Sequence, residues 1–180
     1  MEFNRGARTE MKTLTTLALC AVLFAQPSQS QGTATRASVD SMITFFAGHW
    51  SCEGQFANGS PIAADITFEA TLDSKFLSYA HVDRPPGRFK MTSFWGFDVA
   101  AKGLISAGAD NGGGLRIFRA PGWNAGEVTF ERASLGDSLA RRERFVYRME
   151  SDARFRMTYE IGVGTRWVMG DFLICTRSRE

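Results

Sequence analysis

The sequence predicts an all-β protein, namely one up-and-down antiparallel barrel of about ten strands with a short N-terminal helix closing one end. From residue 48 onward, apolar and polar residues alternate in short segments, and turns rich in Gly, Pro, Asn and Asp separate them. No second convincing helix pattern follows the first. Cys52 lies on the first predicted strand and Cys175 on the last. Barrel closure sets those two strands side by side, whereas a Greek-key sandwich does not require it, so the cysteines favour the barrel.

Length and composition agree with a single folded domain. The chain has 180 residues, of which 44% are hydrophobic and 12% aromatic. This is enough apolar material for an ordinary core and too much for a disordered chain. The 21 basic and 19 acidic residues give a formal charge of only +2. So balanced a chain offers no basic patch, and a nucleic-acid partner is not expected.

The N-terminal region has the layout of a secretory signal peptide. Met11-Lys12 is followed by a short apolar run and then by small polar residues, with Ser28 and Ser30 suited to cleavage. We therefore expect a signal peptide over 1–30, with 1–10 as an upstream extension, and a polar linker over 31–37. The apolar run is too short to span a bilayer, so no transmembrane segment is expected in the mature chain. The predicted location is secreted or periplasmic.

Removal of the signal peptide would leave two cysteines, Cys52 and Cys175. In an oxidising compartment such a pair favours a disulfide; two buried free thiols are the alternative. A metal site needs more ligands than this pair and two distant histidines provide, so none is expected.

The one predicted helix covers about 38–47 and ends at Gly48, because glycine adopts the left-handed conformation cheaply. Its apolar residues recur at helical spacing: Val39, Met42, Ile43 and Phe46. Trp50 follows directly at the start of the first strand. We expect it to plug one end of the barrel against the helix.

The strands that follow are expected from their alternation and from the turns between them. Their predicted ranges are 50–56, 64–72, 76–84, 88–97, 104–109, 115–119, 127–134, 141–151, 154–162 and 166–177. The tight connection at 151–153 predicts a hairpin between two of them.

Several motifs in this order resemble a known family. Gly48-His49-Trp50 is similar to the Gly-X-Trp signature of lipocalins and their calycin relatives. Trp95-Gly96-Phe97-Asp98, the stretch 102–114 with its glycine turn, and the terminal Arg177 resemble an uncharacterised bacterial family of lipocalin-like domains. The resemblance covers roughly 40–178. It implies a closed barrel with an internal cavity, and no known reaction.

Nitrobindin-like haem proteins are similar in architecture at a greater distance. Their haem is held by a histidine close to the C-terminus, and the last predicted strand, Trp167–Arg177, contains none. Haem is therefore not expected, and neither is any other cofactor.

The chemistry-bearing residues are few. His49 is expected at the barrel rim, in contact with backbone. His81 and Asp83 lie two residues apart on one face of a predicted strand and would suit an acid–base pair, with Tyr147 as a further candidate; a plain surface contact is the alternative. No Gly-X-Ser-X-Gly motif is present.

Bulky residues at apolar-phase positions give the remaining clue to function. Most form core, but a barrel of this size can leave room for one small apolar molecule. The predicted ligand contacts are Trp50, Phe68, Met91, Trp95, Tyr147, Met157 and Tyr159. Three hypotheses follow: a non-catalytic barrel that binds or carries a small apolar ligand, an enzyme that uses His81 and Asp83, or a filled barrel with a structural or partner-binding role. The sequence does not indicate the oligomeric state.

Overall fold

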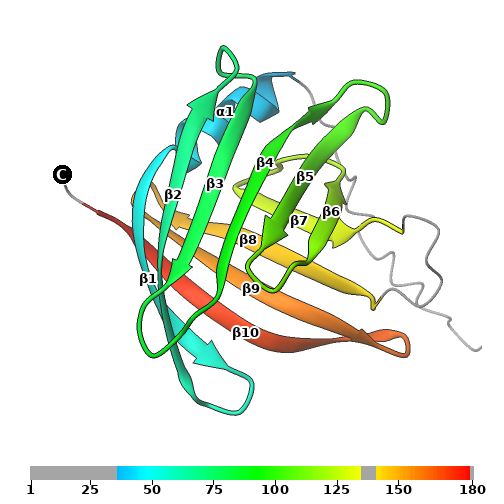
Figure 1. Ribbon diagram of the computed structural model, residues 1–180. Helices are drawn as coiled ribbons and strands as arrows, with labels where there is room; N and C mark the ends of the chain where they lie inside the picture. Colours follow the sequence, from blue (N-terminus) through cyan, green and yellow to red (C-terminus); the bar gives the residue numbers. More distant parts are fainter. Residues whose placement is uncertain (1–35, 135–140, 179–180) are drawn as a thin grey trace, which may run out of the picture.

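The computed structural model describes residues 36–134 and 141–178 and has the predicted fold. Ten antiparallel strands form one closed barrel, and a single helix, α1 (Arg36–Phe46), lies across one end (Figure 1). The all-β, ten-stranded up-and-down barrel is thereby confirmed. The predicted signal peptide over 1–30 and the linker residues 31–35 lie outside the described residues.

The strands follow one another around the barrel in sequence order, and β1 closes it by pairing with β10. Their bounds are β1 (Gly48–Phe56), β2 (Pro61–Thr71), β3 (Phe76–Asp83), β4 (Lys90–Asp98), β5 (Gly103–Asp110), β6 (Leu115–Ala120), β7 (Glu127–Arg132), β8 (Glu143–Ser151), β9 (Arg154–Val163) and β10 (Arg166–Arg177). Each predicted strand is present, with ends shifted by a few residues.

Helix α1 seals the barrel end through its apolar face. Its apolar positions Val39, Met42, Ile43 and Phe46 are all buried. The helix begins at Arg36, two residues before the predicted start, and gives way to β1 at Gly48, whose φ is +125°. A side chain at Gly48 would also meet the Arg177 guanidinium at 2.9 Å. Within the described residues, no helix is both long and apolar enough to cross a bilayer.

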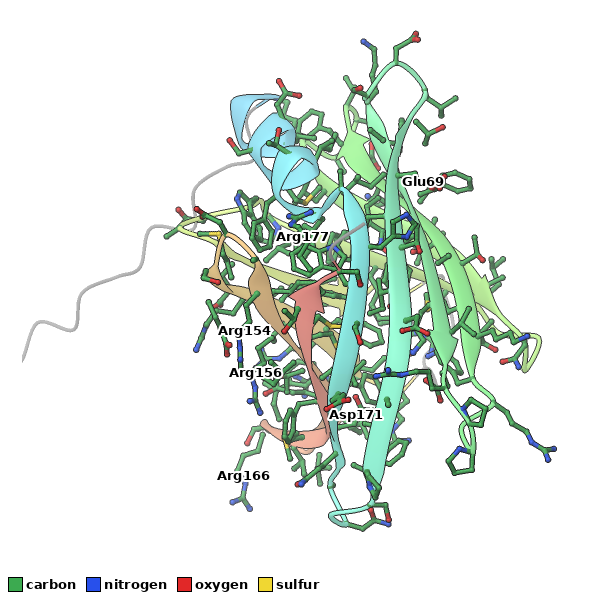
Figure 2. All side chains as sticks on the ribbon, turned by 90° about the vertical axis from the view of Figure 1, so that its left-hand side faces the viewer. Glu69, Arg154, Arg156, Arg166, Asp171 and Arg177 are labelled. Atoms are coloured by element: carbon green, nitrogen blue, oxygen red, sulfur yellow. A yellow bond between two sulfur atoms is a disulfide. The ribbon has the colours of Figure 1, made fainter. Side chains whose placement is uncertain are left out.

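The C-terminal end of α1 is held by side chains from β1 and β10. The Trp50 indole N–H donates to the Phe46 carbonyl at 2.7 Å, and Arg177 donates to the carbonyls of Ala47, at 2.6 Å, and of Phe45. The last carbonyls of a helix lack intrahelical partners and carry partial negative charge, so a guanidinium is well placed there. Arg177 also stacks 4.2 Å from the Trp50 ring centroid. Figure 2 places Arg177 below the helix, at the end of β10.

The barrel interior next to the helix is filled by aromatic rings. Phe46 is at the centre of this floor, with ring centroids 5.0 Å from Phe68, 5.2 Å from Phe155 and 5.5 Å from Trp95. Trp50 packs edge-on against Phe155 at 4.7 Å. Edge-to-face pairs of this kind stabilise a core beyond simple area burial. The floor is therefore densely packed with aromatic rings.

The predicted disulfide is present. Cys52 and Cys175 are directly opposite each other in the β1–β10 register and are bonded, closing a loop of sequence separation 123. The bond links the first and last strands where the barrel closes.

We expect oxidised protein to contain no free thiol at Cys52 or Cys175, and reduction to lower its stability by roughly 4–5 kcal/mol on the chain-entropy model. The loop is long, so cross-linking restricts the unfolded chain strongly. Thiol titration of unfolded, unreduced mature protein counts the free thiols. Urea unfolding of the oxidised and reduced forms then measures the loss of stability. Two titratable thiols in protein exported to an oxidising compartment would contradict the assignment.

Trp50→Ala should destabilise the protein by about 3–5 kcal/mol, because Trp50 is 1% exposed and supports both the helix end and Arg177. Trp123→Ala is the matched control. That ring is only partly buried and stacks on Phe45 from a turn, so its loss should cost clearly less. Chemical denaturation compares the two; a greater loss for Trp123→Ala would show that the barrel end is wrongly assigned.

Candidate functional site

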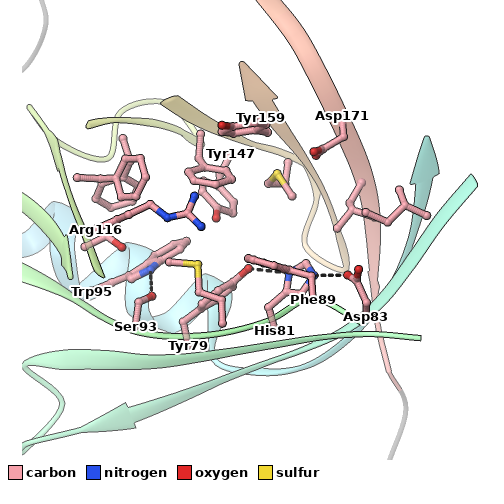
Figure 3. Close-up of a pocket in the computed structure, with 18 of the residues that line it drawn as sticks. Tyr79, His81, Asp83, Phe89, Ser93, Trp95, Arg116, Tyr147, Tyr159 and Asp171 are labelled. Atoms are coloured by element: carbon pink, nitrogen blue, oxygen red, sulfur yellow. Dashed lines mark hydrogen bonds and ion pairs between the residues drawn. The ribbon is translucent and has the colours of Figure 1, made fainter. Parts of the chain in front are cut away.

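Beyond the aromatic floor, the barrel encloses a cavity of about 270 Å³ (Figure 3). Inward positions of the strands supply its walls, because side chains on a strand alternate between the two faces of the sheet. Nine of the 19 lining residues are aromatic: Phe56, Tyr79, Phe89, Trp95, Phe118, Phe130, Phe145, Tyr147 and Tyr159. A dry apolar cavity of about 150 Å³ takes one benzene molecule. The space here is therefore suited to one two-ring aromatic molecule or a similar small ligand.

A chain of hydrogen bonds runs along β3 on the cavity wall. The Tyr79 hydroxyl lies 2.9 Å from His81 Nδ1, and His81 Nε2 lies 2.8 Å from Asp83 Oδ1. Burial lowers the pKa of His81, and the hydrogen bond to Asp83 offsets only part of this effect. The imidazole is therefore neutral at pH 7. A neutral ring has one N–H, and its partner is the carboxylate, which only accepts. We therefore assign the proton to Nε2 and the Tyr79 hydroxyl as donor to Nδ1.

Tyr147 also lines the cavity. Burial raises the pKa of both Tyr79 and Tyr147, so both phenols stay protonated at neutral pH. In the Tyr79–His81–Asp83 chain, each donor is used within the protein and points toward Asp83.

Asp171 lies on the cavity wall in the same phase of β10 as the buried Leu173 and Cys175, directly after a bulge. The β9–β10 register shifts between Met169 and Asp171, so that Met169 is opposite Glu160 while Asp171 is opposite the inward-facing Tyr159. Such a bulge re-aims the side chains on either side of it. Gly170 suits the bulge, since a Cβ there would lie 2.9 Å from the Tyr159 ring.

The Asp171 carboxylate lies in an unfavourable environment for a charge. Burial, with a smaller contribution from the nearby Asp83, raises the pKa of Asp171 to about 6. Among the described residues, no side chain or backbone group donates a hydrogen bond to it or forms an ion pair with it. It is thus an acceptor on the cavity wall without a protein donor.

Arg116 also lines the cavity, but its charge is already matched. Its guanidinium binds Asp110 and lies 3.7 Å from the Glu143 carboxylate. Glu143 is buried and also accepts from Arg132, at 2.7 Å, and from the Tyr159 hydroxyl, at 2.5 Å. The bond from Arg116 lowers the pKa of Asp110. Two carboxylates and two guanidinium groups therefore form a balanced network in this wall.

Two serines complete the polar wall. Ser93 accepts from the Trp95 indole N–H at 3.0 Å. Ser106 is 5% exposed and lines the cavity, and its hydroxyl has no hydrogen-bond partner among the described residues. In the strand register Ser106 is level with Trp95, close to the floor.

The structure brings together most of the predicted site residues. Five of the predicted ligand contacts line the cavity, namely Met91, Trp95, Tyr147, Met157 and Tyr159, as do His81 and Asp83. Trp50 and Phe68 instead lie in the packed floor and do not reach the cavity. His49 is exposed at the rim, where its ring bonds the Thr67 hydroxyl at 3.0 Å, not the backbone as expected.

Sequence reasoning missed four polar residues of this region: Ser106, Arg116, Glu143 and Asp171. Charged side chains such as Arg116 and Glu143 are mostly exposed, and a buried Glu is rare without a partner. The inward phase of Ser106 with Leu104 was the one available signal. Within the described residues, no three His, Cys, Asp or Glu side chains gather as a metal site. The absence of haem stays a prediction.

Comparisons with known proteins add little. No protein-family model matches the chain, and no curated protein matches its sequence. Among solved structures, the chain is similar to EF1p2_mFAP2b bound to DFHBI, with 11% sequence identity and a TM-score of 0.35. That alignment covers 78% of this chain and 98% of the other. A likeness with so low an identity and TM-score does not bear on the function of this chain.

Asp171→Asn should stabilise the empty protein at pH 7.5 by about 1–2 kcal/mol, and not at pH 4.5. A carboxyl whose pKa is raised on folding weakens the fold as pH rises from about 4 through 6, since only the unfolded chain ionises freely. Thermal unfolding at both pH values measures the effect. Asp152→Asn, in the exposed β8–β9 turn, is the control and should leave the stability unchanged at both pH values. Destabilisation by Asp171→Asn at pH 7.5 would contradict this account.

Proposed function

We propose that this chain is an exported, lipocalin-like barrel that binds and carries one small, largely apolar molecule without catalysis. The observation that carries the proposal is the cavity of about 270 Å³ with aromatic walls. The β1–β10 disulfide supports export, because such bonds persist in oxidising compartments. The resemblance of the sequence to lipocalin-like domains agrees with the same reading.

The character of the cavity supports a ligand site over a packing defect. Protein interiors are normally close-packed, so a cavity of this size is unusual for a barrel whose role is only structural. Its wall combines many apolar rings with a few convergent polar groups, the composition of small-molecule pockets. The Ser106 hydroxyl faces it without a protein partner. The filled barrel, the structural alternative, does not account for this space.

An enzyme is the second candidate, and the Tyr79–His81–Asp83 chain favours it. A histidine between a hydroxyl and a carboxylate is a common acid–base arrangement. Here both ring nitrogens are already bonded within the chain, and burial raises the pKa of Tyr79, so its hydroxyl keeps its proton and is a poor acid. These hydrogen bonds therefore favour a role in orienting the polar atoms of the cavity wall over a role in proton transfer. Recovery of a bound molecule in chemically altered form would favour the enzyme.

An uncharged two-ring probe, 2-(1-naphthyl)ethanol, should bind one to one and quench Trp95 fluorescence, because Trp95 is part of the cavity wall. Ser106→Leu should lower its affinity about tenfold or more by occupying the space, while leaving the fold at least as stable. Titration calorimetry measures binding, and circular dichroism checks folding.

Ser51→Leu is the matched control, since Ser51 alternates with the inward Trp50 and Cys52 and faces outward on β1. Its affinity for the probe should equal that of the unchanged protein. If Ser106→Leu does not fold, Met91→Trp fills the cavity from a second wall. Undiminished binding in a folded, cavity-filled variant would overturn the proposal.

A further inference from the structure

We propose that the cavity selects a ligand with a protonated amine on an aromatic body, and that Asp171 and Asp83 hold the ammonium group. This inference rests on the proposed function, because it specifies the chemistry of the molecule bound in the same cavity.

The first ground is the placement of the two carboxylates. Asp83 comes from β3 and Asp171 from β10, and both line one end of the cavity (Figure 3). They lie close enough for Asp83 to affect the charge of Asp171. Asp83 gives one oxygen to His81, and its Oδ2 has no partner among the described residues. An ionised carboxylate only accepts hydrogen bonds, so this end of the cavity requires a donor from the ligand.

The second ground is the absence of a compensating cation in the part of the chain described. Arg116 is held by Asp110 and Glu143. Arg84, which follows Asp83, donates to the Cys52 carbonyl and lies near Glu53 on the outer face. His81 is neutral. Neither guanidinium contacts Asp171, so the missing positive charge would come from the bound molecule.

The third ground is the aromatic wall beside the carboxylates. Phe56 is opposite Asp171 in the β1–β10 register, Tyr159 is its neighbour on β9, and Phe89 packs edge-on to His81 at 5.5 Å. Aromatic faces attract ammonium groups, most strongly where water is excluded. The rest of the cavity accepts the aromatic body, and the unpartnered Ser106 hydroxyl offers one polar contact near the floor.

The fourth ground is that the Asp171 carboxylate destabilises the barrel when no cation is bound. An unpaired, partly buried carboxylate weakens the empty barrel, but it becomes favourable once a cation neutralises it. A neutral side chain would suit a barrel that binds only apolar molecules. Asp171 is therefore better explained by a charged ligand than by folding.

Binding should then depend on pH in a defined direction. The other titratable or charged groups on the cavity wall are Tyr79, His81, Asp83, Arg116, Tyr147 and Tyr159. The three tyrosines keep their protons at neutral pH and below, the pKa of His81 is lowered, and Arg116 stays charged. Asp171, whose pKa is about 6, therefore gains its charge between pH 5 and 7.5. Affinity for an ammonium ligand should rise over that interval.

Three probes of similar shape separate charge from shape: 2-(1-naphthyl)ethylamine, 2-(1-naphthyl)ethanol and 1-naphthylacetate. At pH 7.5 the amine should bind about tenfold or more tightly than the alcohol, and the carboxylate should bind most weakly. Asp171→Asn should reduce the preference for the amine to within about threefold, with little change for the alcohol. Lowering the pH to 5 should weaken amine binding several-fold in the unchanged protein and hardly at all in Asp171→Asn. Asp152→Asn is the control variant and should behave as the unchanged protein.

The outcomes distinguish the two proposals. Equal binding of amine and alcohol, or a preference for the carboxylate, would overturn the ammonium site while leaving the barrel a binding protein. A preference for the amine that survives in Asp171→Asn would also overturn it. Failure of all three probes to bind would overturn both proposals.

Discussion

The pairing of β1 with β10 is the constraint on which the rest of this structure depends. Without it the meander would be an open sheet with two long exposed edges. The register runs from Trp50 opposite Arg177 to Phe56 opposite Asp171, with the disulfide between. One end of this seam holds the C-terminus of α1 through Trp50 and Arg177, and the other end lies at the cavity. The same two strands therefore close the barrel, fix its floor and contribute the side chain that we assign to ligand charge.

The barrel interior has two parts along its axis: a packed aromatic floor next to α1 and a cavity farther from it. Near α1, Phe46 inserts among rings from several strands, so aromatic contacts fill the cross-section. Farther along, no residue of α1 enters, and the strands alone must supply the interior. Ser93, Ser106 and Met91 occupy inward positions there, and their side chains are too small or too slender to fill it. The cavity thus follows from the short reach of one helix and from small residues at inward positions.

Alternation of period two predicted the strands, helical spacing predicted α1, and the order of the strands predicted the cysteine pair, because each depends on local pattern or on the order of elements. The cavity wall could be predicted only in part. Trp50 and Phe68 face the barrel interior, as the residues of the cavity wall do. The alternation in the sequence shows which side chains face inward but not how far along the barrel axis they lie. Asp171 shares the phase of Leu173 and Cys175, and it was missed because a carboxylate is not expected at an inward position of a barrel. Glu143 was missed because its burial depends on Arg132, Arg116 and Tyr159, which only the closed barrel brings together.

The polar wall has a direction. Tyr79 donates to His81, and His81 donates to Asp83, so each donor of this chain is used within the protein and the acceptors accumulate at one end. On the opposite side, Arg116 and Glu143 satisfy each other and their neighbours. Unmatched acceptor capacity therefore remains at Asp83 and Asp171, on the part of the cavity wall that the structure describes. Because an unmatched acceptor is costly in a low-dielectric interior, a cavity built this way discriminates by charge, and an apolar molecule without a donor would leave that cost in place.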